Sequence, residues 1–265
     1  PTVVAVDLRY KSTVGYCYSE ENQIVEDWIL KDDEFPIKGG YSRNSALFSI
    51  SDCQSIIKKA IVERLKEKYK LPWFNETGNK YAIEFSIMKD EVTLTIDTSG
   101  AGLHKRGYRL KANDAPIKET LAASLCTLAR LRPYHTLYDP MCGSGTILIE
   151  GAMKALNMAP GISRTFAAEK FSQIDPKVWA EERTRAQDLI NFDCEFHAYG
   201  SDIDANAIEL AKENARRAGV EKRIDFEVLD LKDWERKSEK GTVICNPPYG
   251  ERLLDINAAN DLYKL

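Results

Sequence analysis

The residues best placed to do chemistry are Asn246 and Pro247, which directly follow a largely apolar stretch at 242–245. A second proline, Pro248, comes next, and two consecutive prolines lack backbone N–H donors and hold the chain extended. The Asn246 side chain and nearby carbonyl groups would then point outward from the end of a strand, at the sheet edge where α/β proteins bind ligands. Taken alone, Asn-Pro-Pro-Tyr also suits an ordinary loop.

A glycine turn at 139–146, with the sequence Asp-Pro-Met-Cys-Gly-Ser-Gly-Thr, is the second candidate. It lies between an expected strand and an expected helix, so its N–H groups could face an anionic ligand group. Packing of the helix on the strand is the alternative reason for such glycines. A nicotinamide site fits poorly, because the spacing is not G-x-G-x-x-G and the candidate carboxylate Asp202 follows much later than the usual ~20 residues.

Two further carboxylates, Asp202 and Asp230, each follow an expected strand. Asp202 is placed to accept hydrogen bonds from ribose hydroxyls, and Asp230 to meet an adenine amino group. Asp204 is expected to cap the helix that follows it. For each carboxylate considered singly, a place in a surface turn is the alternative.

Alternating strands and helices are expected to position these residues. The pattern predicts strands at 136–138, 198–201, 225–229 and 242–245, and helices from about 116, from 145, at 179–190 and at 205–218. This alternation indicates a parallel sheet with helices on both faces. On the helix from about 116, the residues expected to share the buried face are Ile117, Leu121, Leu125 and Leu128.

The first part of the chain predicts a smaller α+β unit. Short stretches at 2–8, 14–18 and 28–30 indicate strands, and 31–40 indicates a loop. Ser51 and Gln54 have the spacing of a capping box, which predicts a helix there. Period-two alternation at 81–87 and 92–96 around a polar turn predicts a hairpin.

A glycine-containing basic stretch at 103–115 reads as a linker between the two parts. From 103 to 132 there are seven Lys or Arg against two acidic residues, a local charge of +5. Lys105, Arg106 and Arg109 are therefore candidates for contacts with RNA phosphates. A solvated surface is the alternative.

The composition is that of a soluble globular protein, with 265 residues, 43% hydrophobic, and a net charge of −4. The six cysteines are scattered without a Cys-x-x-Cys pair, and the three histidines show no ligand spacing. We therefore expect no metal and a reducing, cytoplasmic location. No apolar run is long enough to span a membrane, and no signal-peptide pattern is present, so no membrane partner is expected.

In this order, the motifs at 103–109, 115–123, 139–146, 200–204 and 244–253 resemble those of the THUMP-domain RNA methyltransferases, which use S-adenosylmethionine. The resemblance is closest to bacterial 23S ribosomal RNA guanine-N2 methyltransferases, often labelled N6-adenine-specific DNA methylases. It implies a THUMP-containing RNA-binding region at 1–102, the basic linker at 103–115, and a Rossmann-like class I methyltransferase domain at 116–265. Few residues follow Gly250, so we expect that domain to be incomplete at its C-terminus.

The resemblance also implies roles for individual residues. The residues it implies for cofactor binding are Asp139, Cys142, Gly143, Gly145 and Thr146 for the methionine part, Asp202 for the ribose, and Ile203 and Asp230 for the adenine. Asn246 Oδ1 and the Pro247 carbonyl would accept hydrogen bonds from an exocyclic amine, and Tyr249 would stack on the extruded base. Ribosomal RNA or its precursor is the expected partner.

Other functions stay open at this point. Asn-Pro-Pro-Tyr also serves N6-adenine methylases of DNA or RNA and glutamine methylases of release factors, although the THUMP-like region favours RNA. A non-catalytic RNA-binding or ribosome-assembly protein with a relic cofactor site is a second alternative, and the presence of Asp139, Asp202 and Asn246 argues against it. A nicotinamide dehydrogenase is the least favoured.

Overall fold

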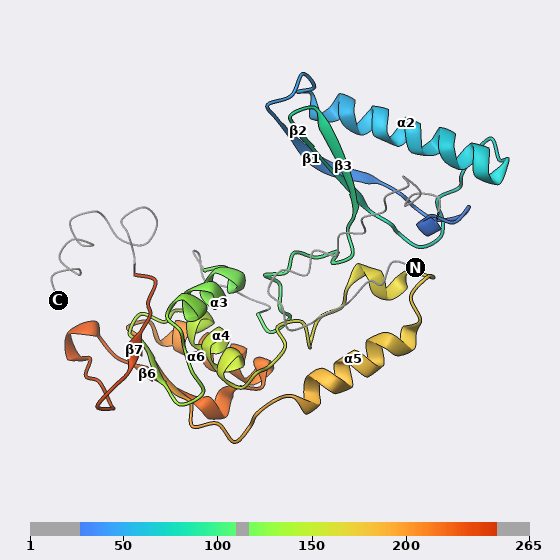
Figure 1. The fold of residues 1–265 in the computed structure, drawn as a ribbon. Coiled ribbons are helices and arrows are strands. Elements are labelled where there is room, and N and C mark those ends of the chain that lie inside the picture. Colours follow the sequence, from blue (N-terminus) through green and yellow to red (C-terminus); the bar gives the residue numbers. More distant parts are fainter. Residues whose placement is uncertain (1–26, 110–116, 248–265) are drawn as a thin grey trace. The chain divides into compact units, whose positions relative to one another are not determined.

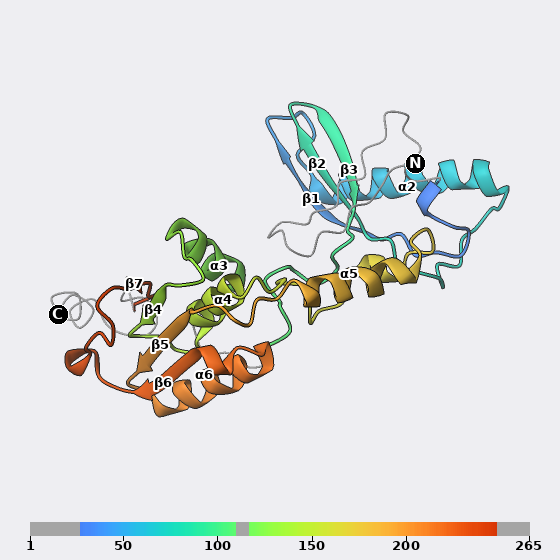
Figure 2. The ribbon, with the colours of Figure 1, turned by 60° about the horizontal axis from the view of Figure 1, so that its bottom comes forward.

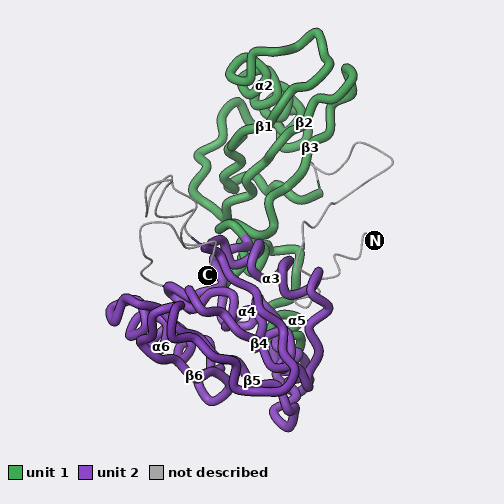
Figure 3. Tube along the Cα trace, turned by 90° about the vertical axis from the view of Figure 1, so that its left-hand side faces the viewer, with its two compact units in different colours: residues 1–7, 12–102, 165–182 green, residues 8–11, 103–164, 183–265 purple. Residues whose placement is uncertain are grey.

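The computed structural model describes residues 27–109 and 117–247 (Figure 1). These residues divide into two compact units, which are coloured separately in Figure 3. The first unit comprises 27–102 and 165–182, and the second comprises 103–109, 117–164 and 183–247. The segment 165–182, which follows the glycine turn in sequence, therefore groups with the first unit.

The first unit is built on a three-stranded sheet with the order β1-β2-β3. Its elements are β1 (Ile37–Arg43), α2 (Ile50–Tyr69), β2 (Ile83–Met88) and β3 (Glu91–Ile96). β2 pairs in parallel with β1 and antiparallel with β3, so the predicted hairpin is confirmed. Phe85 and Ile87 alternate with exposed or half-buried residues along β2 and pack against Cys53 of α2, which covers one face of the sheet.

Three local predictions for this unit are wrong. Residues 28–30 form no strand, and the expected loop at 31–40 gives way to β1 from Ile37 onward. Gly40, the glycine that suggested a loop, lies instead in β1, where it allows β1 and β2 to approach closely, because a Cβ there would lie 2.2 Å from Phe85 O. Helix α2 begins at Ile50 with Ser49 as its N-cap, and Gln54 donates instead to the carbonyls of Ile37 and Lys38. The strands predicted at 2–8 and 14–18 lie outside the described residues.

The segment 165–182 contributes aromatic side chains to the first unit. It contains the short helix η1 (Ala167–Lys170) and the start of α5 (Pro176–Asp188). Phe171 stacks on Tyr81 with ring centroids 4.3 Å apart, and Trp179 belongs to the same buried cluster. The helix predicted at 179–190 is present but begins and ends earlier.

The second unit is a parallel α/β arrangement with the strand order β6-β5-β4-β7 (Figure 2). Its strands are β4 (Thr136–Asp139), β5 (His197–Asp202), β6 (Ile224–Val228) and β7 (Thr242–Val243), and its longer helices are α3 (Glu119–Leu128), α4 (Thr146–Ala155) and α6 (Ala205–Ala218). Helix α6 has the predicted bounds and ends at Gly219, which has a φ of 72°. The predicted strands and helices of this unit are present.

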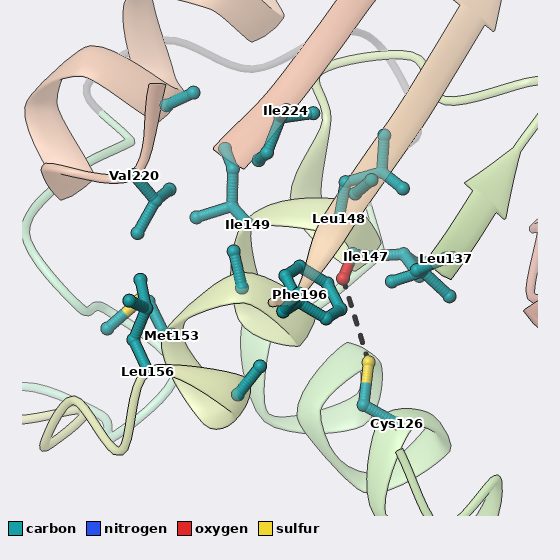
Figure 4. Close-up of a cluster of buried hydrophobic side chains, with 14 of the residues drawn as sticks. Cys126, Leu137, Ile147, Leu148, Ile149, Met153, Leu156, Phe196, Val220 and Ile224 are labelled. Atoms are coloured by element: carbon teal, nitrogen blue, oxygen red, sulfur yellow. Dashed lines mark hydrogen bonds between the residues drawn. The ribbon is translucent and has the colours of Figure 1, made fainter. Parts of the chain in front are cut away.

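The core of the second unit lies between the sheet and these three helices (Figure 4). Leu137, Ala198 and Ile224 point from neighbouring strands toward side chains of α3, α4 and α6. On the opposite face Tyr138 stacks on Tyr199 at 5.3 Å and meets Trp234 edge-on. Within the described residues the three long helices therefore cover one face, not two as predicted, and aromatic side chains line the other.

Helix α3 buries a different face from the one predicted. Leu121 and Leu128 are 53% and 79% exposed, whereas the small residues Ala122, Ala123 and Cys126 are buried. The reason is close packing on α4, where the Cys126 thiol donates to Ile147 O at 3.6 Å, as Figure 4 shows. Larger side chains on this face would hold the two helices apart.

Candidate functional site

The glycine loop at 140–145 connects β4 to α4. Gly143 and Gly145 have φ values of 51° and 78°, in the left-handed region that favours glycine. A Cβ at Gly145 would also lie 3.1 Å from Ala211 Cβ and from Phe226 Cζ. No side chain caps α4, so its N-terminal N–H groups can serve an anionic ligand group.

Hydrogen bonds attach this loop to the end of β5. The Cys142 N–H donates to Ser201 O at 2.9 Å, and the Gly143 N–H donates to Asp202 Oδ2 at 2.8 Å. Burial, followed by the charges of Asp139 and Asp202, raises the pKa of the Cys142 thiol far above its ordinary value. Cys142 is therefore a neutral thiol, and its backbone N–H and carbonyl hold the loop together by bonding Ser201 O and the Gly145 N–H.

Asp139 is the buried carboxyl group of the site, with 1% of its surface exposed. Burial raises the pKa of Asp139 to about 8, with a smaller increase from the charge of Asp202, while the hydrogen bond from the Met141 N–H lowers it. The group is thus largely protonated at neutral pH. A cation placed beside it would favour the ionised form.

Asp202 and Ile203 lie together at the carboxyl edge of the sheet. Asp202 Oδ1 accepts from the Asp204 N–H at 3.0 Å, and Ile203 is 72% exposed. Asp204 accepts from the Asn206 N–H and caps α6, as predicted. The edge therefore presents a carboxylate next to an exposed apolar side chain, a combination suited to a nucleoside.

Asp230 follows β6 and has a local structural partner. Its Oδ1 accepts from the Lys232 N–H at 3.0 Å, which caps the short helix η3 (Leu231–Asp233). The neighbouring Leu229 N–H donates to Asp202 O at 3.0 Å, so the end of β6 lies beside the end of β5. The adenine contact of Asp230 stays a prediction.

Asn246 reaches the same edge from β7. Tyr138 of β4 pairs in parallel with Val243, and the Ile244 N–H donates to Tyr138 O at 2.9 Å. Asp139, the last residue of β4, and the segment after β7 that contains Asn246 therefore lie at neighbouring strand ends. Burial and the charge of Asp139 raise the pKa of Cys245, the residue before Asn246. The Asn246 side chain is exposed. Tyr249 lies outside the described residues.

Two of the three predicted phosphate-binding residues have intramolecular partners instead. Arg106 is 4% exposed, with its Nε 3.4 Å from Glu150 Oε1. Arg109 pairs with Glu119, its Nη2 lying 2.9 Å from Glu119 Oε2. Both guanidiniums are thus enclosed beside carboxylates, and the RNA contacts of Arg106 and Arg109 stay predictions. Lys105 is exposed, and its contact with RNA stays a prediction.

The sequence analysis missed two buried polar residues near the loop. Glu150 accepts from the Tyr108 hydroxyl at 3.1 Å, and burial raises the pKa of Glu150 despite the neighbouring Arg106. Asn214, which is fully buried, donates from Nδ2 to Ser144 O at 3.1 Å. A signal for Asn214 was available, since this polar residue lies at helical spacing from the apolar Ala207 and Ala211.

Within the described part of the chain, no group of three or more His, Cys, Asp or Glu is arranged to hold a metal ion. A search of the same residues for a helix long and apolar enough to cross a membrane finds none.

Comparison with known proteins gives a family for each part of the chain. Residues 106–265 match the family described as "RMKL-like, methyltransferase domain", and residues 21–97 match the THUMP domain. "Putative RNA methyltransferase YpsC" of Bacillus subtilis (strain 168) is 44% identical over 239 residues, which are 89% of this chain and 62% of that protein. "Ribosomal RNA large subunit methyltransferase K/L" of Aliivibrio salmonicida is 42% identical over 214 residues, 78% of this chain and 30% of that one.

A solved structure agrees with these relatives. The crystal structure of SMU.472 complexed with SAH superposes with a TM-score of 0.83 at 37% identity, covering 91% of this chain and 64% of that one. The chain thus spans less than two thirds of the length of each of these three proteins. The resemblance and the fold class expected from the sequence are confirmed. The chain belongs to the RMKL-like methyltransferase domain family, with a THUMP domain preceding the methyltransferase domain.

Proposed function

We propose that this chain binds S-adenosylmethionine along the carboxyl edge of β4, β5 and β6. The loop from Gly143 to Thr146 would hold the methionine part, with Asp139 near its ammonium group. Asp202 would accept hydrogen bonds from the ribose, Ile203 would pack on the adenine, and Asp230 would meet the adenine amino group. Three observations support this fit: the glycine loop joined to Asp202, the exposed Ile203 beside it, and the absence of a side-chain cap on α4.

The adjacent ends of β4 and β7 carry the catalytic part of the proposal. When bound, S-adenosylmethionine supplies an electrophilic methyl group on a sulfonium sulfur. Asn246 Oδ1 and the Pro247 carbonyl accept the two N–H groups of an exocyclic amine, which draws lone-pair density onto the nitrogen and orients it. Both acceptors are neutral and fixed by the prolines, so they stabilise the positive charge that develops on that nitrogen. Tyr249 stacks on the extruded base.

We infer that the amine is N2 of a guanine in large-subunit ribosomal RNA or its precursor. The THUMP domain, the exposed Lys105 in the basic stretch and the name of the Aliivibrio relative support an RNA substrate. From such a substrate we infer a cytoplasmic location. Because adenine N6 suits the same two acceptors, the choice of guanine rests on the family resemblance.

The test is methylation of ribosomal RNA in vitro with labelled S-adenosylmethionine, followed by digestion and identification of the labelled nucleoside. We expect N2-methylguanosine, and N6-methyladenosine would overturn the substrate assignment. Asn246→Ala should bind the cofactor normally while kcat falls by about 10²-fold or more, the scale seen when one preorganised donor or acceptor is removed. A fully active Asn246→Ala enzyme would overturn the mechanism.

A further inference from the structure

Arg109 occupies a position from which it contacts the start of two helices. Its side chain is only 11% exposed, and its Nη2 lies 2.9 Å from Oε2 of Glu119, the first residue of α3. Its Nη1 donates to Ile117 O at 3.0 Å and to Thr146 Oγ1 at 3.2 Å. Thr146 is the first residue of α4 and directly follows the glycine loop.

The contact with Thr146 continues into the loop. The Thr146 hydroxyl lies 3.2 Å from Ser144 Oγ, and Thr146 is 2% exposed. Because Thr146 Oγ1 accepts from Arg109, its own proton is free to be donated to Ser144. A buried chain of polar contacts thus runs from Glu119 through Arg109 and Thr146 to Ser144.

The charges and hydration of these groups explain why an arginine paired with a carboxylate suits this position. A cation near the N-terminus of α4 opposes the helix dipole, and enclosing a guanidinium removes much of its hydration. Glu119 offsets both effects, since a carboxylate in the first turn of α3 is favourable there and neutralises Arg109. A guanidinium can bond a carboxylate and two further oxygens at once, which a lysine ammonium on its flexible stem does less well.

We propose that Arg109 is a positioning residue of the cofactor site, which holds Ser144 and the first turn of α4 in the geometry that binds S-adenosylmethionine. Asn214 holds the same loop from α6 through Ser144 O, so the loop is fixed by two independent buried side chains. The inference rests on the proposed function for the identity of the ligand. It replaces RNA binding as the role of Arg109.

The experiment compares Arg109→Lys with Lys222→Ala, a change at an exposed lysine of the same unit that lies outside the proposed sites. Calorimetry gives the affinity for SAH. Hydrogen exchange of the amides at 144–149, measured without ligand, reports on the end of the glycine loop and the first turn of α4. Thermal denaturation checks that each variant folds. We expect Arg109→Lys to fold, to bind SAH about 10-fold more weakly or worse, and to exchange the 144–149 amides faster. Lys222→Ala should match the wild type in all three measurements.

Thr146→Val provides a second variant, because it removes the oxygen that Arg109 contacts and leaves the Arg109–Glu119 pair in place. It should weaken SAH binding, and combining it with Arg109→Lys should add little, since both changes break the same contact. Unchanged SAH affinity and unchanged exchange in folded Arg109→Lys, or fully additive effects in the double variant, would overturn the proposal. Loss of RNA binding by Arg109→Lys with normal SAH affinity would overturn it in favour of the RNA role. If the wild type fails to bind SAH, the proposed function falls, while the exchange measurement still decides whether Arg109 holds the loop.

Discussion

Replacing Asp139 with Asn should make the stability of the protein less dependent on pH. Burial raises the pKa of Asp139 to about 8 from an ordinary 3.8, so between these values the folded protein keeps a proton that the unfolded chain releases. The stability that this group contributes is full below about pH 4 and is lost as the pH rises through about 8. The loss is ~1.4 kcal/mol per pH unit, so between about pH 5 and pH 7 the wild type should lose about 3 kcal/mol relative to Asp139→Asn.

The assay is urea unfolding of both proteins at several pH values from about 5 to 9, without cofactor, followed by circular dichroism. Subtracting the two free energies of unfolding removes the contribution of every other titrating group. The free energy of unfolding of Asp139→Asn minus that of the wild type should rise steadily to about pH 8 and then stay constant. In an Asp202→Asn background, which retains an acceptor for the Gly143 N–H but removes the neighbouring charge, it should level off at a lower pH. A difference that stays flat between about pH 5 and pH 7 would mean that Asp139 ionises normally and that burial does not control it.

Two further outcomes are expected. Asp202→Ala should weaken binding of S-adenosylmethionine by about 10- to 100-fold, the loss expected for a charge-assisted hydrogen bond, as measured by calorimetry. Asp204→Ala should leave this affinity unchanged and lower the free energy of unfolding in urea by ~1 kcal/mol, because the helix cap is lost. Equal affinities for the two variants would remove Asp202 from the ribose site. Gly200→Ala should lower the free energy of unfolding by roughly 1 to 3 kcal/mol through overpacking, because the new Cβ would lie 2.4 Å from Leu148 Cδ1 and 2.9 Å from Phe226 Cδ1. At Gly219 the new Cβ would have open space, but φ is 72°, so Gly219→Ala should lower the free energy of unfolding by only about 1 kcal/mol through backbone strain.

Local sequence patterns were sufficient where a residue acts on its immediate neighbours. Asp204 caps the start of α6 and Gly219 ends it, both through contacts with residues a few positions away, and both predictions are confirmed. The left-handed backbone at Gly145 is likewise a local requirement of the turn between β4 and α4. The order of the motifs at 139–146, 200–204 and 244–253 predicted the family for the same reason, since each motif is a run of consecutive residues that can be recognised without the tertiary structure.

Tertiary structure decided which partner each long side chain and each helix face would meet. Arg106 and Arg109 have the composition of a phosphate-binding patch, but Glu150 and Glu119, which neutralise them, come from two helices folded against that segment. The buried face of α3 is set by its close packing on α4, because the small Ala122 and Cys126 fit between the two helices and the larger Leu121 and Leu128 do not. Pairing of β4 with β7 brings Asp139 and Asn246 to one edge across a long stretch of chain. Local propensity carries no information on such contacts, because their energy comes from burial and pairing between residues far apart in the sequence.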